Sequence, residues 1–295
     1  MWDWMSTTTA DSETLDRVRQ SPILNFEHTT RHNKLLRSEA EYQGVKFTIN
    51  GFQPQKVWIR FSPHKLYNSI FGFVNKRGEP MNHDTFTPAK LEYVLDWLAD
   101  TFAIDPCTCT THHIEFGVNL RGLVIPTRTI IENLIAYGLQ GKQFNIMEVV
   151  NAGMGRKLLF SQYLLKLYDK ALQNGIEYEI FRFEYKALKM QNVEYIFGRN
   201  TRLIDFLEPT FWIRCKDKLL SVLDCCIFDD DYDVDHKNLP MWRNSREWGA
   251  MSSSNRSRQK KAFDQFIEQH GKLHIKQTLT EAIENEVRAM LDGYV

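Results

Sequence analysis

The segment YLLKLYDKALQNGIEYEIFRFEYKALKM, residues 163–190, contains two stretches in which apolar and charged residues alternate. In residues 162–168 the odd positions are Tyr, Leu and Leu, whereas the even positions include Lys166 and Tyr168. In residues 181–186 the odd positions are aromatic, and the even positions are Arg182, Glu184 and Lys186. Because a β-strand sends successive side chains to opposite faces, each stretch is predicted to be a strand with one apolar and one charged face. The turn-like QNG between them favours antiparallel neighbours.

Two earlier segments, residues 57–64 and 113–119, alternate in the same way, and helical spacing is found in residues 88–102 and 126–141. The sequence therefore predicts an α+β fold, with a mainly antiparallel sheet, helices packed on one face, and an open charged face. If the four strands are neighbours, the open face carries Arg60, His64, His113, Glu115, Lys166, Tyr168, Arg182, Glu184 and Lys186.

Composition limits the classes of function. The 295 residues include 37 Lys plus Arg and 37 Asp plus Glu, so a nucleic-acid surface would have to be a local patch. The five cysteines lack the spacing of zinc ligands, which predicts reduced thiols in a cytoplasmic protein. No run of 18 apolar residues and no signal peptide is found, so no membrane partner is expected.

The chain is predicted to divide into an N-terminal segment (1–43), a core (44–210) and a helical C-terminal region (211–295). Residues 1–22 are polar and are expected to be loosely ordered. The C-terminal region contains the basic run NRSRQKK, residues 255–261. Its Lys260 and Lys261 are candidates for contacts with DNA phosphates, although an exposed helix start would have the same composition.

The charged face has two interpretations on residue patterns alone. It is either a solvated sheet surface with cross-strand ion pairs, each contributing under about 1 kcal/mol, or a functional site. Two carboxylates among several cations, with a tyrosine and histidines, is an unusual set for a surface without a ligand.

The order of motifs resembles that of rolling-circle replication initiators. YLLKLYDKA followed by FRFEYK is similar to the tyrosine–lysine and Arg-x-Glu strands of plasmid initiators of the Rep_trans type. The filamentous-phage gene II protein family has a similar order, with counterparts of FSPHKLYN and HIEFGVN before the tyrosine strand. The resemblance covers roughly residues 45–210 and implies a Rep-like (HUH) nuclease fold. The adjacent histidines of HHI, residues 112–114, depart from the His-hydrophobic-His metal motif of many such nucleases.

This resemblance implies a transesterification in which a tyrosine hydroxyl attacks a DNA phosphodiester and forms a 5′-phosphotyrosine. Tyr168 would be the nucleophile, with Lys166 and Lys170 lowering its pKa from the usual value near 10. The metal, Mg²⁺ or Mn²⁺, would be held by residues whose oxygen or imidazole atoms suit it, namely Glu115, Glu184 and either His64 or His113. DNA phosphates would be bound by Arg182, Lys186 and Arg60.

The function predicted in this way is site-specific nicking and joining of DNA at the start of rolling-circle replication of a plasmid or phage-like element. The implied partners are origin DNA, as duplex or hairpin and as single strand, a host helicase, and a second copy of the chain. The alternatives are a catalytically silent protein that binds an origin or RNA, and a metal phosphodiesterase that uses water. The parity of the strands predicts that Tyr168, Glu115 and Glu184 project from the same side of one sheet, as the nicking hypothesis requires.

Overall fold

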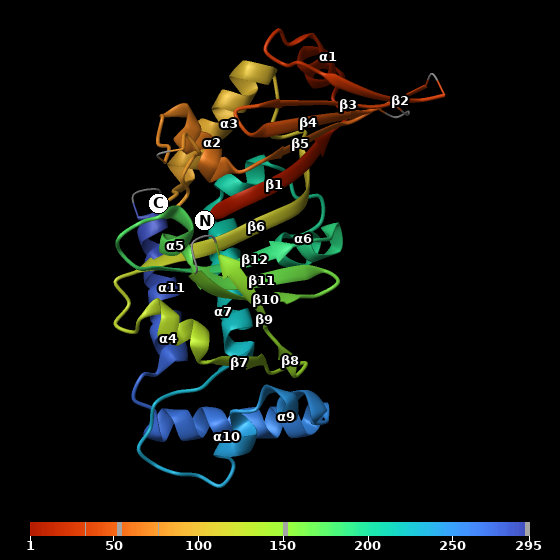
Figure 1. Cartoon of the computed structure of the whole chain (residues 1–295). Coiled ribbons are helices and arrows are strands. Elements are labelled where there is room, and N and C mark those ends of the chain that lie inside the picture. The colour runs from red at the N-terminus through yellow and green to blue at the C-terminus, as the bar shows by residue number, and fades with distance from the viewer. Residues whose placement is uncertain (33, 52–54, 76, 150–152, 293–295) are drawn as a thin grey trace.

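The computed structural model describes all residues except 33, 52–54, 76, 150–152 and 293–295. Its main feature is a ten-stranded antiparallel sheet that runs through the molecule (Figure 1). In sheet order the strands are β2 (Glu27–Arg31), β3 (Lys34–Tyr42), β4 (Val45–Asn50), β5 (Val57–Phe61), β1 (Trp2–Thr9), β6 (Thr110–Arg121), β12 (Ile180–Ala187), β11 (Tyr163–Asp169), β10 (Gly153–Leu159) and β9 (Asn145–Val149).

Helices and a second, small sheet complete the fold. The helices are α1 (Ser12–Gln20), α2 (Pro63–Ile70), α3 (Pro88–Phe102), α4 (Thr127–Glu132), α5 (Lys170–Asn174), α6 (Met190–Phe197), a 3₁₀ turn (Ile204–Leu207), α7 (Pro209–Cys225), α8 (Leu239–Trp242), α9 (Ser245–Ala250), α10 (Ser253–His270) and α11 (Ile275–Leu291). The second sheet has the order β13 (Cys226–Phe228), β7 (Leu134–Tyr137) and β8 (Lys142–Gln143). The predicted α+β class with a mainly antiparallel sheet is confirmed.

The apolar face of the central strands packs against α6, α7 and α11. Its aromatic centre is Trp2, which is fully buried and lies edge-on to Trp212 at 5.3 Å and to Phe206 at 5.0 Å between ring centroids. Phe116 and Phe183, from β6 and β12, are also fully buried. Because aromatic side chains fill this face, the charged residues of these strands lie on the opposite face of the sheet, which does not pack against these helices.

The N-terminal residues differ most from expectation. Instead of being loosely ordered, residues 2–9 form β1, which pairs with β5 on one side and β6 on the other. The sequence hid this strand because its second half is a polar run, Ser6 to Thr9, whose members are nonetheless all buried. The predicted segment 1–43 is therefore not separate from the core.

Two further predictions are corrected by the structure. The helix expected over residues 126–141 ends at Glu132, and Leu134–Tyr137 form β7 instead. The C-terminal region, residues 211–295, is also not one unit, because α7 and α11 pack on each other and on β6, whereas α8, α9 and α10 enclose a second apolar cluster that includes Trp242, Trp248 and Phe263. Among the described residues, no helix is long and apolar enough to cross a membrane.

Candidate active site on the charged face of the sheet

Strands β6, β12 and β11 are neighbours, and their register places the predicted residues side by side. Lys166 lies opposite Glu184, Tyr168 opposite Arg182, and Lys186 opposite Glu115. Because residues that face each other across an antiparallel pair share a face, the predicted parity of Tyr168, Glu115 and Glu184 is confirmed.

The side chains are also in direct contact. The Tyr168 hydroxyl donates a hydrogen bond to Glu184 Oε1 over 2.6 Å. The Lys166 ammonium donates to Glu184 Oε2 over 2.6 Å and to Glu115 Oε1 over 2.5 Å. Lys186 Nζ lies 2.8 Å from the other oxygen of Glu115. A tyrosine hydroxyl, two carboxylates and two ammonium groups thus form one continuous polar network.

Asp3 joins this network and was missed by sequence reasoning. Oxygens of Asp3, Glu115 and Glu184 lie within 4.8 Å of one another, which makes these buried carboxylates a candidate site for a metal ion. Asp3 reaches the charged face at a register shift between Trp2 and Trp4, where two residues of β1 oppose Glu115 alone. The only signal in the sequence is an acidic residue between two tryptophans, and this signal does not reveal the bulge.

Arg182 forms hydrogen bonds with two of the three carboxylates. Its guanidinium is buried, and it donates to Glu184 Oε1 over 3.0 Å, to Asn119 Oδ1 over 3.1 Å, and to Asp3. The predicted role of Arg182 was to bind a DNA phosphate, but in the structure its donors face inward. Lys166 and Lys186, whose side chains are 21% and 27% exposed, are the cations of this network that reach the solvent.

The charged face is therefore open over one part of the network and closed over another. Tyr168, Lys170, Arg182 and Glu184 are all buried. Asn119 donates to the main-chain carbonyl of Asn82 over 3.2 Å, and Asn82 donates to Asp3 over 3.1 Å, so the loop around residue 82 lies over the Arg182 end. The prediction of an open face holds for the partly exposed Lys166, Lys186, Arg60 and His113, and it is wrong for the buried Tyr168, Arg182 and Glu184.

Two glycines make room for the tyrosine and the glutamate. Gly117 faces Glu184 across β6 and β12, and a Cβ atom there would lie 3.0 Å from Glu184 Cγ and closer still to the Phe183 carbonyl oxygen. Gly155 faces Tyr168 across β10 and β11, where a Cβ atom would lie 2.7 Å from Tyr168 Cβ. Any other residue at these positions would displace the side chain that it faces.

We expect Gly117→Ala to shift Glu184 and to destabilise the fold by about 1–3 kcal/mol, because an atom is forced into a packed site. Thermal unfolding and the affinity for Mn²⁺ would measure both effects. Gly249→Ala is a suitable control, because its Cβ would meet only the Gly141 carbonyl oxygen, at 3.2 Å. Equal behaviour of the two variants would show that the space opposite Glu184 is not needed.

Burial controls the ionisation of the tyrosine. It raises the pKa of Tyr168 well above the ordinary value, and the Glu184 carboxylate raises it further, against the opposing effect of Arg182. The expectation that Lys166 and Lys170 lower this pKa is therefore wrong for the protein by itself, since Lys166 is engaged by the two glutamates. Lys170 Nζ lies 3.4 Å from the Tyr168 hydroxyl, and burial lowers the pKa of Lys170 to about 8.

The charged pairs stay ionised despite their burial. Burial alone would raise the pKa of Glu184, but Arg182 and Lys166 outweigh it and hold the pKa well below its usual range. Burial likewise opposes the charge of Lys166, whose pKa is nevertheless raised by Glu184 and Glu115. These groups are kept charged by one another, as a buried ion-pair network requires.

The two histidines predicted as metal ligands lie outside the carboxylate group. His64 is buried in the first turn of α2, where Nε2 is 2.6 Å from Asp84 Oδ1, and burial lowers its pKa to about 4. His113 is half-buried and stacks on Trp4 at 6.5 Å between ring centroids. Arg60 shares the charged face with His113, because both lie opposite Ser6, and its guanidinium donates to Thr48 over 2.6 Å.

The predicted DNA contacts of the C-terminal region lie elsewhere. Lys260 is on α10, which Figure 1 shows beyond the end of the main sheet, and it pairs with Asp264 at 2.5 Å. Its neighbour Lys261 is exposed. The structure thus does not bring Lys260 and Lys261 together with Tyr168.

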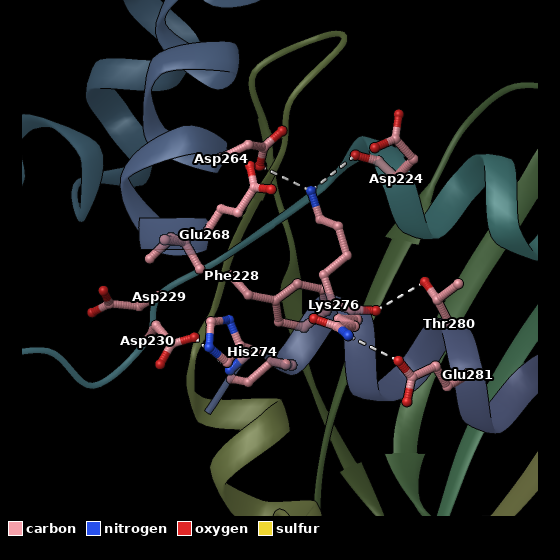
Figure 2. A pocket seen from close by; sticks show the side chains of 13 residues that line it. Asp224, Phe228, Asp229, Asp230, Asp264, Glu268, His274, Lys276, Thr280 and Glu281 are labelled. Atoms are coloured by element: carbon pink, nitrogen blue, oxygen red, sulfur yellow. Dashed lines mark hydrogen bonds and ion pairs between the residues drawn. The ribbon is translucent and has the colours of Figure 1, made fainter. Parts of the chain in front are cut away.

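A cavity of about 470 Å³ lies between α10 and α11 (Figure 2), and Tyr168 is not among the residues that line it. Most of its charged lining residues are acidic, and two of them form hydrogen bonds that link segments of the chain. Asp230 accepts hydrogen bonds from the main-chain N–H groups of Leu273 over 2.8 Å and of His274 over 2.9 Å. Asp264 accepts a hydrogen bond from the side-chain ammonium of Lys276 over 3.0 Å. Asp230 and Asp264 therefore stabilise the connection between the two helices.

Comparison with known proteins leaves the family open. No protein-family model matches the chain, and no curated protein matches it in sequence. Among solved structures, the chain is similar to a rolling circle replication initiator protein from Geobacillus stearothermophilus, with a TM-score of 0.48 and 13% sequence identity. That match covers 84% of this chain and 92% of the other.

Proposed function

We propose that this protein nicks and rejoins single-stranded DNA through Tyr168 with the help of a divalent metal, and that this reaction initiates rolling-circle replication of a plasmid or phage-like element. The observation that carries the proposal is the 2.6 Å hydrogen bond from the Tyr168 hydroxyl to Glu184, within the carboxylate group of Asp3, Glu115 and Glu184. A hydroxyl nucleophile, acidic ligands and phosphate-binding cations are the components of phosphodiester transfer. The order of sequence motifs points to the same class of reaction.

The reaction is a balanced exchange of ester bonds. The Tyr168 oxygen forms a bond to phosphorus as the bond from phosphorus to the 3′-oxygen breaks. The tyrosine proton passes to a base, and the leaving 3′-oxygen takes up a proton. The products are a 5′-phosphotyrosine and a free 3′-hydroxyl, and attack by such a hydroxyl on the phosphotyrosine restores the DNA.

The three carboxylates fit a hard divalent cation. They offer only oxygen donors, which suits Mg²⁺ or Mn²⁺, and their oxygens are near enough to share one ion. When bound, the ion would polarise the scissile phosphate. Asp3, Glu115 and Glu184 would hold it, whereas His64 and His113 are not needed as ligands. In the structure Lys166 bridges the two glutamates. If a metal ion took the place of its ammonium between them, the ammonium would shift toward the solvent and could contact the DNA phosphate.

Lys170 is the best-placed acceptor for the tyrosine proton. The carboxylate of Glu184 is closer, but its pKa is held well below the usual range, so it is a weak base. Lys170 has a pKa of about 8 and lies 3.4 Å from the hydroxyl. A general base is most effective when its pKa is near the working pH.

The rate of nicking is therefore expected to rise with pH and to level off above about 8, because Lys170 is an ammonium below its pKa and a free amine above it. Lys170→Met should slow nicking by about a hundredfold or more and should remove this rise. Lys237→Met, which changes an exposed lysine, is the matched control. A rate that falls as Lys170 loses its proton would show that its positive charge is needed instead.

The experiment that tests the proposed function is incubation of the protein with single-stranded DNA that contains the replication origin, in the presence of Mn²⁺, followed by denaturing electrophoresis. A covalent protein–DNA species that carries phosphotyrosine, mapped by mass spectrometry, is the expected result. Cleavage without an adduct would identify a phosphodiesterase that uses water. Binding without cleavage would identify a silent origin-binding or RNA-binding protein. A host helicase and a second copy of the chain remain proposed partners.

A further inference from the structure

Strands β2 and β3 form a two-stranded ribbon, residues 27–42, at one edge of the main sheet. The outer ends of the two strands, at Arg31 and Lys34, are called the tip, and Figure 1 shows that they project beyond the other strands. All five residues of β2 are exposed. The outer part, residues 28–37, contains three Arg or Lys and two His and has no acidic residue. The ribbon tip is therefore a local basic patch on a chain whose formal net charge is zero.

The cations at the tip do not stabilise the hairpin. Arg31 lies directly opposite Lys34 in the register of the two strands. Like charges in this position destabilise an antiparallel pair. Within the described part of the chain, neither residue has an ion pair with an acidic group, in contrast to Arg37, which pairs with Glu39 at 3.1 Å. Unpaired like charges at an exposed tip are explained most simply by an anionic partner.

Charge is also segregated along the ribbon. The acidic residues Glu27, Glu39 and Glu41 all lie at its base, where Glu27 faces Glu39 and where β3 pairs with β4. A partner with negative charge would thus meet the tip and be repelled from the base. The shape indicates which partner this is, because the major groove of B-DNA, about 12 Å wide, admits a two-stranded β-ribbon.

We propose that the β2–β3 ribbon binds duplex DNA, with its tip in the major groove and with Arg31 and Lys34 on the phosphates. This inference rests on the proposed function, since it assigns the ribbon to duplex next to the nicking site. From β3 to β12, the strand of Glu184, the sheet has five strand spacings, on the order of 24 Å in total. This span corresponds to about seven base-pair steps of 3.4 Å. Because the projection of the tip along the strands adds to this span, the ribbon would hold the duplex at least about seven base pairs from the single strand to be cut.

The test is the affinity of the full-length protein for a mixed-sequence DNA duplex of about three helical turns and for a single strand of the same length, by fluorescence anisotropy at several salt concentrations. The variant is Arg31→Gln/Lys34→Gln. The matched control is Lys237→Gln/Arg246→Gln, which removes two exposed cations elsewhere. Sedimentation of each variant reports its oligomeric state, and thermal unfolding confirms that it is folded.

The ribbon variant is expected to bind the duplex about tenfold more weakly, with a salt slope smaller in magnitude by about two, because two phosphate contacts are lost. Its affinity for the single strand should fall less, and the control should match the native protein. Equal losses in both double variants, or equal losses for duplex and single strand, would overturn the proposal. Unchanged duplex affinity with loss of self-association would also overturn it and would assign the edge of β2 to a second copy of the chain. Since no cleavage is measured, a failure of the nicking reaction would be seen separately.

Discussion

Tyr168→Phe is expected to abolish the covalent protein–DNA adduct and to reduce strand cleavage by several orders of magnitude, because no other atom can replace a missing nucleophile. The substitution removes one oxygen atom and leaves the ring in place. It also removes the hydrogen bond to the Glu184 carboxylate, and a hydrogen bond to a charged group contributes about 1.5–3 kcal/mol to folding. The variant should therefore fold and bind DNA. The measurement is the yield of adduct on denaturing gels with Mn²⁺ and single-stranded DNA.

Tyr163→Phe is the matched control for this experiment. Tyr163 belongs to the same strand but has the opposite parity, and it stacks on Phe160 at 4.4 Å and on Tyr185 at 5.1 Å between ring centroids. It should retain the adduct in full. An adduct that persists in Tyr168→Phe and maps to a different tyrosine would disprove the assignment of the nucleophile.

The second large effect is expected from the carboxylates. Glu115→Gln, Glu184→Gln and Asp3→Asn should each slow metal-dependent cleavage by about a thousandfold or more, since the charge stabilisation supplied by a metal is worth several kcal/mol. The amide keeps the shape of the side chain but is a much poorer ligand for a hard cation. Titration with Mn²⁺ should show weaker binding in the same variants, whether or not cleavage is measured.

Loss of fold must be separated from loss of metal in these variants. Glu184 is buried beside Arg182 and Lys166, and removing one partner of a buried ion pair typically costs about 3–5 kcal/mol. Glu115 is the more informative position, because Lys166 and Lys186, its two partners, reach the solvent. Glu208→Gln is the control, because it changes an exposed carboxylate at the N-cap of α7, a helix that packs on β6 and β12. Full cleavage by Glu115→Gln, or by the native protein in excess chelator, would exclude the metal.

Much of the central sheet was predictable from local patterns. The alternation in residues 113–119, 162–168 and 181–186 is a property of the strand backbone itself, because successive side chains point to opposite faces. It was enough to place Tyr168, Glu115 and Glu184 on one face. Sequence patterns did not predict β1, because the second half of this strand is polar but buried. They also did not predict β7, because its apolar residues continue the helical spacing of the preceding segment.

The sequence by itself determined which side chains share a face of the sheet. Only the tertiary structure decided which of these side chains are in contact. Asp3 and Arg182 are separated by 179 positions and are joined because β1, β6 and β12 are adjacent, with a bulge turning the aspartate toward the arginine. Strand order depends on the packing of the whole core, which no local period records. Burial is likewise a property of the assembled fold. It raises the pKa of Tyr168 and lowers that of Lys170 to about 8, and the proposed mechanism therefore assigns the tyrosine proton to a neighbouring base and does not require a depressed pKa of the tyrosine itself.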